Sequence, residues 1–137
     1  MPGKITAKYD VQKKYLVIYL CAFIGSGLLF LLRALDLLAP GLSPLPSFLL
    51  LHVTNFSLSL MVLSSFGFAA LIFGGGIKTI TAAGLSIAAI NIAYELLFPI
   101  LGTPDFPDAA SGLIGAAAAY VFLLLLRKNG LTSKRKS

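Results

Sequence analysis

Four long apolar segments, separated by short breaks rich in proline and glycine, make up most of the chain. A helix crosses the hydrocarbon core of a bilayer with about 20 mostly apolar residues, and proline and glycine tend to end helices. Segments of sufficient length lie at about 15–38, 47–73, 77–101 and 107–126. The pattern predicts an all-α fold, a four-helix transmembrane bundle that occupies residues 15–128.

The composition agrees with a bilayer as the solvent. The 137 residues are 58% hydrophobic and only 12% charged, whereas a soluble domain has roughly 25% charged residues. The first apolar segment is too long for the core of a signal peptide and no A-x-A cleavage site follows it, so we expect it to be retained. The single cysteine, Cys21, lies within this segment and is expected to be a small buried hydrophobic residue.

The basic residues predict the orientation. All of the Lys and Arg residues except Arg33 fall on one side of the predicted membrane, in residues 1–14, at Lys78 and in residues 127–136. The positive-inside rule then makes this a multi-pass cell-membrane protein with both termini in the cytoplasm, where 1–14 and 129–137 form basic segments. The C-terminal tail looks disordered. Because the cations flank apolar runs, we expect them to contact anionic lipid heads and predict no nucleic-acid partner.

Polar side chains gather at the opposite, outer end of the predicted bundle. His52 and Asn55 share one face of the second span, and Asn91 and Glu95 share one face of the third. All four spans contribute ionisable or amide groups at this level. The cluster of candidate site residues consists of Arg33, Asp36, His52, Asn55, Asn91, Glu95, Asp105 and Asp108. Its acids could hold a divalent cation through their oxygen atoms, but they have no calcium-loop spacing, so we assign no metal ligands and expect no cofactor.

Several members of the cluster also have a purely structural explanation. Asp108 could be the N-cap of the fourth span, and Asp105 suits a turn. Arg33 and Asp36 could neutralise each other at a helix end, and His52 could be a packed interfacial residue.

Glu95 is the strongest functional candidate of the cluster. A carboxylate inside a membrane span costs roughly 2.5–3.5 kcal/mol on insertion scales, so it is usually paired, protonated or functional. We expect Glu95 to have a functional role, with Arg33 or His52 as its partner.

Small residues on the fourth span indicate close helix packing. Gly112 and Ala116, and likewise Gly115 and Ala119, have the small-xxx-small spacing that lets another helix approach. Gly67 on the second span could do the same. We expect this packing to lie within the bundle, and an oligomer is not indicated.

The segment between the third and fourth spans resembles the VanZ-like membrane proteins. That family has an aromatic or small residue, a Glu, an irregular loop, an Asp and, seven positions later, a Gly; a His lies near the start of its second helix. The matching residues here are Tyr94, Glu95, Asp108, Gly115 and His52. The resemblance covers about residues 48–127. The chain departs from the pattern at Phe98, where the family commonly has Gln, and in its short loop without Arg.

The resemblance implies a bacterial cell-envelope membrane protein with a link to susceptibility to the glycopeptide teicoplanin. With the outer polar cluster, it favours a non-enzymatic protein that binds a lipid, a cell-wall precursor or an ion. The alternative is a small proton-coupled transporter that acts as an oligomer. A membrane hydrolase is disfavoured because the chain has one His and neither an H-E-x-x-H nor a G-x-S-x-G motif.

Overall fold

The computed structural model describes residues 7–35, 52–97 and 106–134, and for residues 95–97 the backbone alone. It contains four helices that are long and apolar enough to span a membrane: α1 (Lys13–Ala34), α3 (Val53–Ile72), α4 (Ile77–Leu97) and α5 (Phe106–Leu125). These helices confirm the predicted all-α class and the predicted number of spans. The parts of the predicted spans at 36–38, 47–51 and 98–101 lie outside the described residues.

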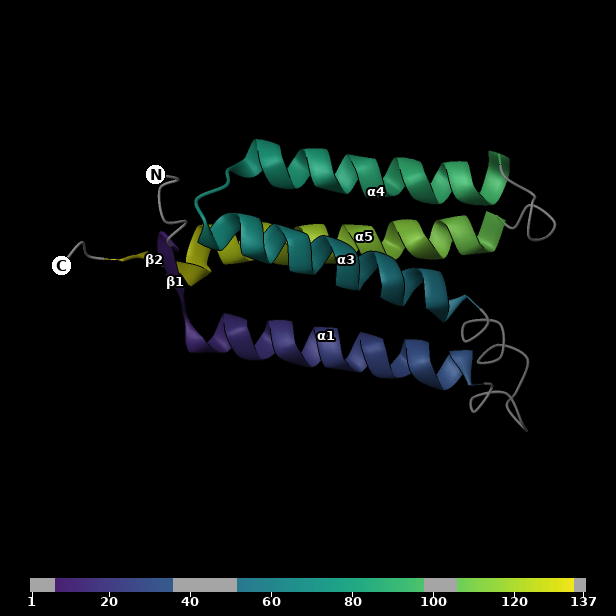
Figure 1. Cartoon of the computed structure of the whole chain (residues 1–137), viewed down its shortest axis with the longest axis horizontal. Coiled ribbons are helices and arrows are strands. Elements are labelled where there is room, and N and C mark those ends of the chain that lie inside the picture. Colours follow the sequence, from purple (N-terminus) through teal and green to yellow (C-terminus); the bar gives the residue numbers. More distant parts are fainter. Residues whose placement is uncertain (1–6, 36–51, 98–105, 135–137) are drawn as a thin grey trace, which may run out of the picture.

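The helices α3 and α5 form the centre of the molecule. They pack against each other most extensively, α1 packs on α3, and α4 packs on α5 and to a lesser extent on α3. Figure 1 shows α1 and α4 on opposite sides of this central pair. The buried core is made largely by α3, α4 and α5, and includes Leu63, Leu71, Ile80, Ala119 and Leu123.

Small residues bring the central helices together. A Cβ atom added at Gly115 of α5 would overlap the backbone carbonyl oxygen of Phe56 on α3, and one added at Gly67 of α3 would overlap the side chain of Leu123 on α5. Ala116 and Ala119 of α5 are buried in the hydrophobic core, and Ala116 also faces the groove between α4 and α5. The small-xxx-small pattern therefore serves packing within the chain, as predicted.

The outer helices carry large apolar side chains on their surfaces. Ile24 of α1 is 64% exposed, and Leu85 and Ile90 of α4 are 67% and 64% exposed. Such a surface requires lipid rather than water around it, so the chain is a four-span integral membrane protein in contact with the bilayer. Cys21 is also exposed on α1. The expectation that it is buried was wrong, because α1 packs along one side only.

A small sheet joins the two ends of the chain. Strand β1 (Tyr9–Val11) pairs antiparallel with β2 (Leu131–Ser133), and a π-helical turn, Leu126–Gly130, connects α5 to β2. The prediction that the tail from residue 128 is disordered was therefore wrong for residues 128–134. Both chain ends lie at the same end of the bundle, which we call the terminal end (Figure 1). An even number of spans requires both chain ends to lie on the same side of the membrane, in agreement with this arrangement. That this side is the cytoplasm stays a prediction.

Candidate functional site

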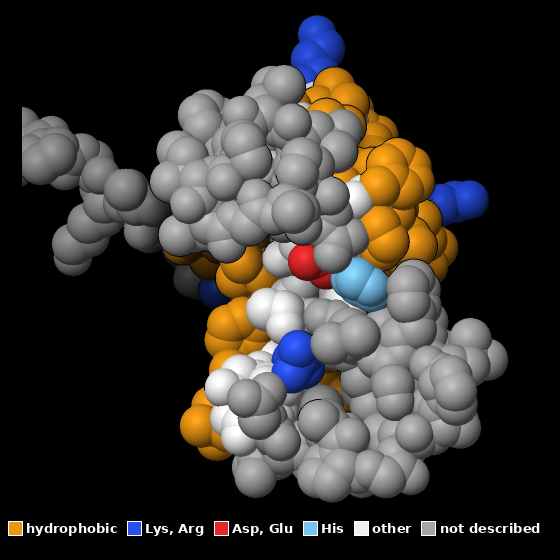
Figure 2. Space-filling view, turned by 90° about the vertical axis from the view of Figure 1, so that its right-hand side faces the viewer, with side chains coloured by type: hydrophobic (Ala, Val, Ile, Leu, Met, Phe, Trp, Pro, Cys, Tyr) orange, Lys and Arg blue, Asp and Glu red, His pale blue; other side chains and the backbone are white. Residues whose placement is uncertain are grey.

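The end opposite the terminal end brings together two helix N-termini. Because α3 and α5 run parallel, both begin there, and His52 directly precedes α3 while Asp108 lies in the first turn of α5. The His52 Nδ1 and Asp108 Oδ1 atoms are 2.6 Å apart, and the side chains are 14% and 30% exposed. In Figure 2, which looks at this end, the pale-blue histidine touches a red acidic side chain. An ionised Asp108 accepts a hydrogen bond from the imidazole ring.

Ser111 ties this pair to the backbone. Its hydroxyl donates to the carbonyl oxygen of His52 and accepts from the N–H of Phe56 at 3.1 Å. Phe56 is the fourth residue of α3, so its N–H faces the carbonyl oxygen of the N-cap residue His52 across the first turn. The Ser111 hydroxyl therefore bridges the donor and the acceptor of this first turn. Ser111 lies three residues after Asp108 and therefore on the same face of α5. The start of α3 is thus held by two side chains of α5.

A second polar contact lies deeper between the helices. The amide nitrogen of Asn91 on α4 donates to Ser59 Oγ on α3 and to the Ile87 carbonyl oxygen, both at 2.9 Å. Gly112 of α5 makes room for this side chain, because a Cβ atom there would overlap Asn91 Oδ1. Asn91 therefore joins three helices.

An apolar groove of about 490 Å³ lies beside the His52–Asp108 pair. It runs between the first turns of α3 and α5, and Phe106 and Ile114 on its wall are 72% and 62% exposed. His52 and Ser111 are the polar side chains among the residues that line it. The complete lining is His52, Val53, Phe56, Phe106, Pro107, Ala110, Ser111 and Ile114.

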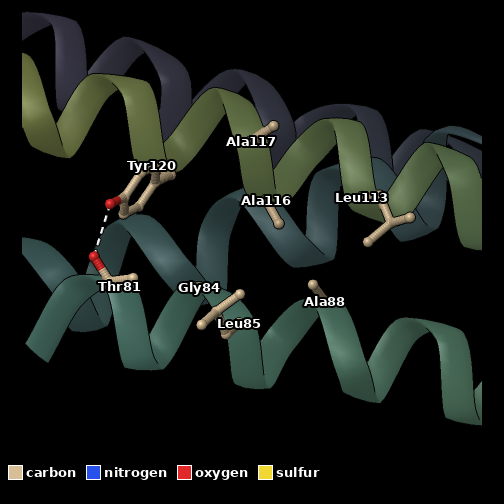
Figure 3. A pocket seen from close by; sticks show the side chains of 8 residues that line it. All are labelled: Thr81, Gly84, Leu85, Ala88, Leu113, Ala116, Ala117 and Tyr120. Carbon is tan, nitrogen blue, oxygen red and sulfur yellow. Dashed lines mark hydrogen bonds between the residues drawn. The ribbon is translucent and has the colours of Figure 1, made fainter. Parts of the chain in front are cut away.

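A second groove, of about 240 Å³, lies between α4 and α5 (Figure 3). Its lining is apolar except for Thr81 and Tyr120, whose hydroxyl oxygens are 2.7 Å apart and bonded to each other. This groove lacks a charged side chain in its described lining. It can hold an apolar chain, whereas the described lining of the groove at His52 adds a histidine that is bonded to a carboxylate.

The structure brings part of the predicted cluster together. His52 meets Asp108, and Asn91 lies below them between the same helices. Arg33 is in the last turn of α1 and Asn55 in the first turn of α3, and neither is unpaired. Asp36 and Asp105 lie outside the described residues, and only the backbone of Glu95 is described.

Two details of the sequence interpretation change. Asp108 is not the N-cap of the fourth span, because α5 begins at Phe106 and the carboxylate bonds His52. Its place in the first turn remains favourable, since the positive end of the helix dipole is there. Ser59 and Ser111 were missed. Their spacing in the sequence could have identified them. Ser59 follows His52 by seven residues and so lies on the same face of α3, and Ser111 follows Asp108 by three residues and so lies on the same face of α5.

Fold and site together define a four-span integral membrane protein with a His–Asp pair at the edge of an apolar groove. No family model, curated protein or solved structure matches the chain.

Proposed function

We propose that the protein is a non-enzymatic cell-envelope protein that binds an amphiphilic molecule, a lipid or a lipid-linked cell-wall precursor, at the His52 end of the bundle. The observation that carries this proposal is the position of the His52–Asp108 pair at the edge of the groove. The groove accommodates part of a hydrocarbon chain, and the pair provides the polar contacts that orient its headgroup.

The chemistry of Asp108 indicates the kind of headgroup. One carboxylate oxygen accepts from His52, and the side chain remains 30% exposed. An ionised carboxylate has several lone pairs and accepts further hydrogen bonds, so it favours a headgroup that carries hydroxyl or ammonium donors.

The resemblance to VanZ-like proteins is part of the proposal. His52, Asp108 and Gly115 belong to the matching pattern, and they lie at one helix–helix contact, where Gly115 packs on the Phe56 backbone. Cytoplasmic termini would place the site at the outer leaflet, where cell-wall precursors are used. A link to teicoplanin susceptibility would follow from binding there.

The described contacts favour binding over the alternatives. The Ser111 hydroxyl donates to the backbone carbonyl of His52 and not to its ring, so it lacks the arrangement of a Ser–His–Asp nucleophile. The His52–Asp108 pair lies at the helix ends, whereas coupling sites of secondary transporters lie near the bilayer midplane. We therefore do not favour the proton-coupled transporter.

Filling the groove tests the proposal. The protein is reconstituted with a photoactivatable phosphatidylethanolamine that carries a diazirine in its acyl chain, and the labelled peptides are identified. We expect labelling of the 106–114 segment to fall severalfold in Ala110→Trp, because the indole occupies the groove. The matched control is Ala118→Trp, an exposed position on the same helix outside the lining. Labelling of 106–114 that is the same in both variants and in the wild type would refute the proposed binding.

A headgroup variant tests the polar half of the site. Asp108→Asn keeps the size of the side chain but removes the negative charge. We expect it to reduce labelling by phosphatidylethanolamine more than labelling by phosphatidylcholine, whose quaternary ammonium cannot donate a hydrogen bond. An equal effect on both lipids would show that the carboxylate does not recognise the headgroup.

A further inference from the structure

The terminal end of the bundle contains a different kind of cavity, of about 570 Å³. Its floor is apolar and includes Leu71 of α3 and Leu124 of α5. Its rim carries Arg127 and Lys128 from the π-helical turn and Tyr9 from β1. The described lining therefore provides two cations and a phenol, and no carboxylate.

The π-helical turn places the two cations. Such turns are rare in proteins and are found often at functional sites. Leu126 and Gly130 at its two ends are buried, whereas Arg127 and Lys128 between them are exposed. A Cβ atom at Gly130 would lie 2.7 Å from the ring of Tyr15, so only glycine lets the turn pass under that ring. The Gly130 carbonyl oxygen then accepts from Gln12 N–H at 2.9 Å, which anchors the turn to the N-terminal segment.

The charges around the cavity are unbalanced. Asp10 is the acidic residue described at this end, and its carboxylate lies 3.3 Å from Lys134 Nζ rather than in the cavity. Lys8 adds a cation close by: its side chain covers Gly74, the neighbour of the lining residue Gly75. Gly74 has a φ of +92°, a conformation that other residues rarely adopt, so the turn under Lys8 depends on it. The described part of the cavity is consequently positive.

We propose that Arg127, Lys128 and Tyr9 form a binding site for the phosphate of an anionic phospholipid headgroup. Arg127 directly follows the apolar run that ends α5, so the rim lies where the helix leaves the hydrocarbon core. Guanidinium and ammonium groups bind phosphate oxygens, and basic pockets between membrane helices bind anionic headgroups. The apolar floor beside the cations suits the start of an acyl chain. A free phosphate compound offers the same phosphate group but has no acyl chain to contact the apolar floor.

The test compares anionic lipid retained by variants that lose the same charge. The purified full-length protein is incubated with phosphatidylglycerol in mixed micelles, and native mass spectrometry measures the lipid bound. We expect Arg127→Gln with Lys128→Gln to lower retention by about tenfold, since each interfacial cation contributes severalfold. The control is Lys13→Gln with Lys78→Gln, two exposed cations at the same end that do not line the cavity. Equal losses in both double variants would refute a specific site.

Two further measurements complete the test. The exchange Arg127→Lys with Lys128→Arg keeps both charges and should retain the lipid; if it loses the lipid as completely as the glutamine variant, disruption of the turn rather than charge explains the effect and the proposal fails. Phosphate and glycerol phosphate are added separately to lipid-free protein. Thermal stabilisation by these soluble anions at micromolar concentration would overturn the lipid assignment in favour of a soluble phosphate compound; its absence supports the lipid.

Discussion

Single glycine residues determine how closely the central helices approach. Gly115 faces the Phe56 backbone, which cannot move without shifting the start of α3 and the hydrogen bonds that hold it. Gly25 on α1 is different, because a Cβ atom there would meet nothing within 4 Å. The same residue type is thus essential for packing at one position and dispensable at the other.

We predict that Gly115→Ala destabilises the protein and that Gly25→Ala does not. Overpacking costs about 1–3 kcal/mol, whereas replacing Gly by Ala in a helix interior gains up to about 1 kcal/mol. Gly115→Ala combines the cost of overpacking with the gain in helix propensity, whereas Gly25→Ala has only the gain. Thermal unfolding in detergent measures the difference. Equal stability of the two variants would show that α3 and α5 are not in the close contact described here.

The His52–Asp108 hydrogen bond should appear as an energetic coupling. Hydrogen bonds to charged groups contribute about 1.5–3 kcal/mol when buried, and partial exposure of this pair reduces the expected value to about 1 kcal/mol. We compare the free energy of unfolding of His52→Ala, Asp108→Ala and the double variant. The loss in the double variant should be about 1 kcal/mol smaller than the sum of the losses in the two single variants.

The matched cycle uses Asp10 in place of Asp108. Asp10 lies in β1, at the other end of the bundle from His52, so His52→Ala and Asp10→Ala should be additive. Additivity in the Asp108 cycle as well would show that His52 and Asp108 do not interact, which would contradict the proposed site.

At the scale of whole elements, the helices could be predicted and the sheet could not. Apolar runs of about 20 residues have few alternatives in a bilayer, which is why four spans were found. Those predicted ends that fall on described residues agree with the helices to within a few residues. The strands at Tyr9–Val11 and Leu131–Ser133 are only three residues long, and each forms because the other end of the chain lies beside it. The His52–Asp108 pair has the same character: both residues were candidates, but their contact depends on the parallel packing of α3 and α5.

The register of the sheet can be tested by cross-linking. Asp10 and Thr132 are directly opposite each other, and opposite residues of antiparallel strands have Cα atoms about 4.5–5.5 Å apart, within reach of a disulfide. We expect Asp10→Cys with Thr132→Cys, in a Cys21→Ala background, to form an intramolecular disulfide under mild oxidation. Asp10→Cys with Lys134→Cys, two residues further along, is the control and should form it more slowly. Slow oxidation of the Asp10–Thr132 pair would contradict the sheet.

At the scale of the whole molecule, the structure places both termini at one end of an apolar bundle, and the remaining prediction is which side of the membrane that end faces. The excess of basic residues there predicts the cytoplasm. Single cysteines at Asn129, which is exposed at the terminal end, and at Ser43, in the 39–46 segment of the sequence, distinguish the two orientations in a Cys21→Ala background. An impermeant thiol reagent on intact cells should label position 43, and position 129 only after the cells are permeabilised. If position 129 is labelled on intact cells and position 43 is not, the orientation is reversed, and the His52–Asp108 site would face the cytoplasm and bind a ligand of the inner leaflet instead.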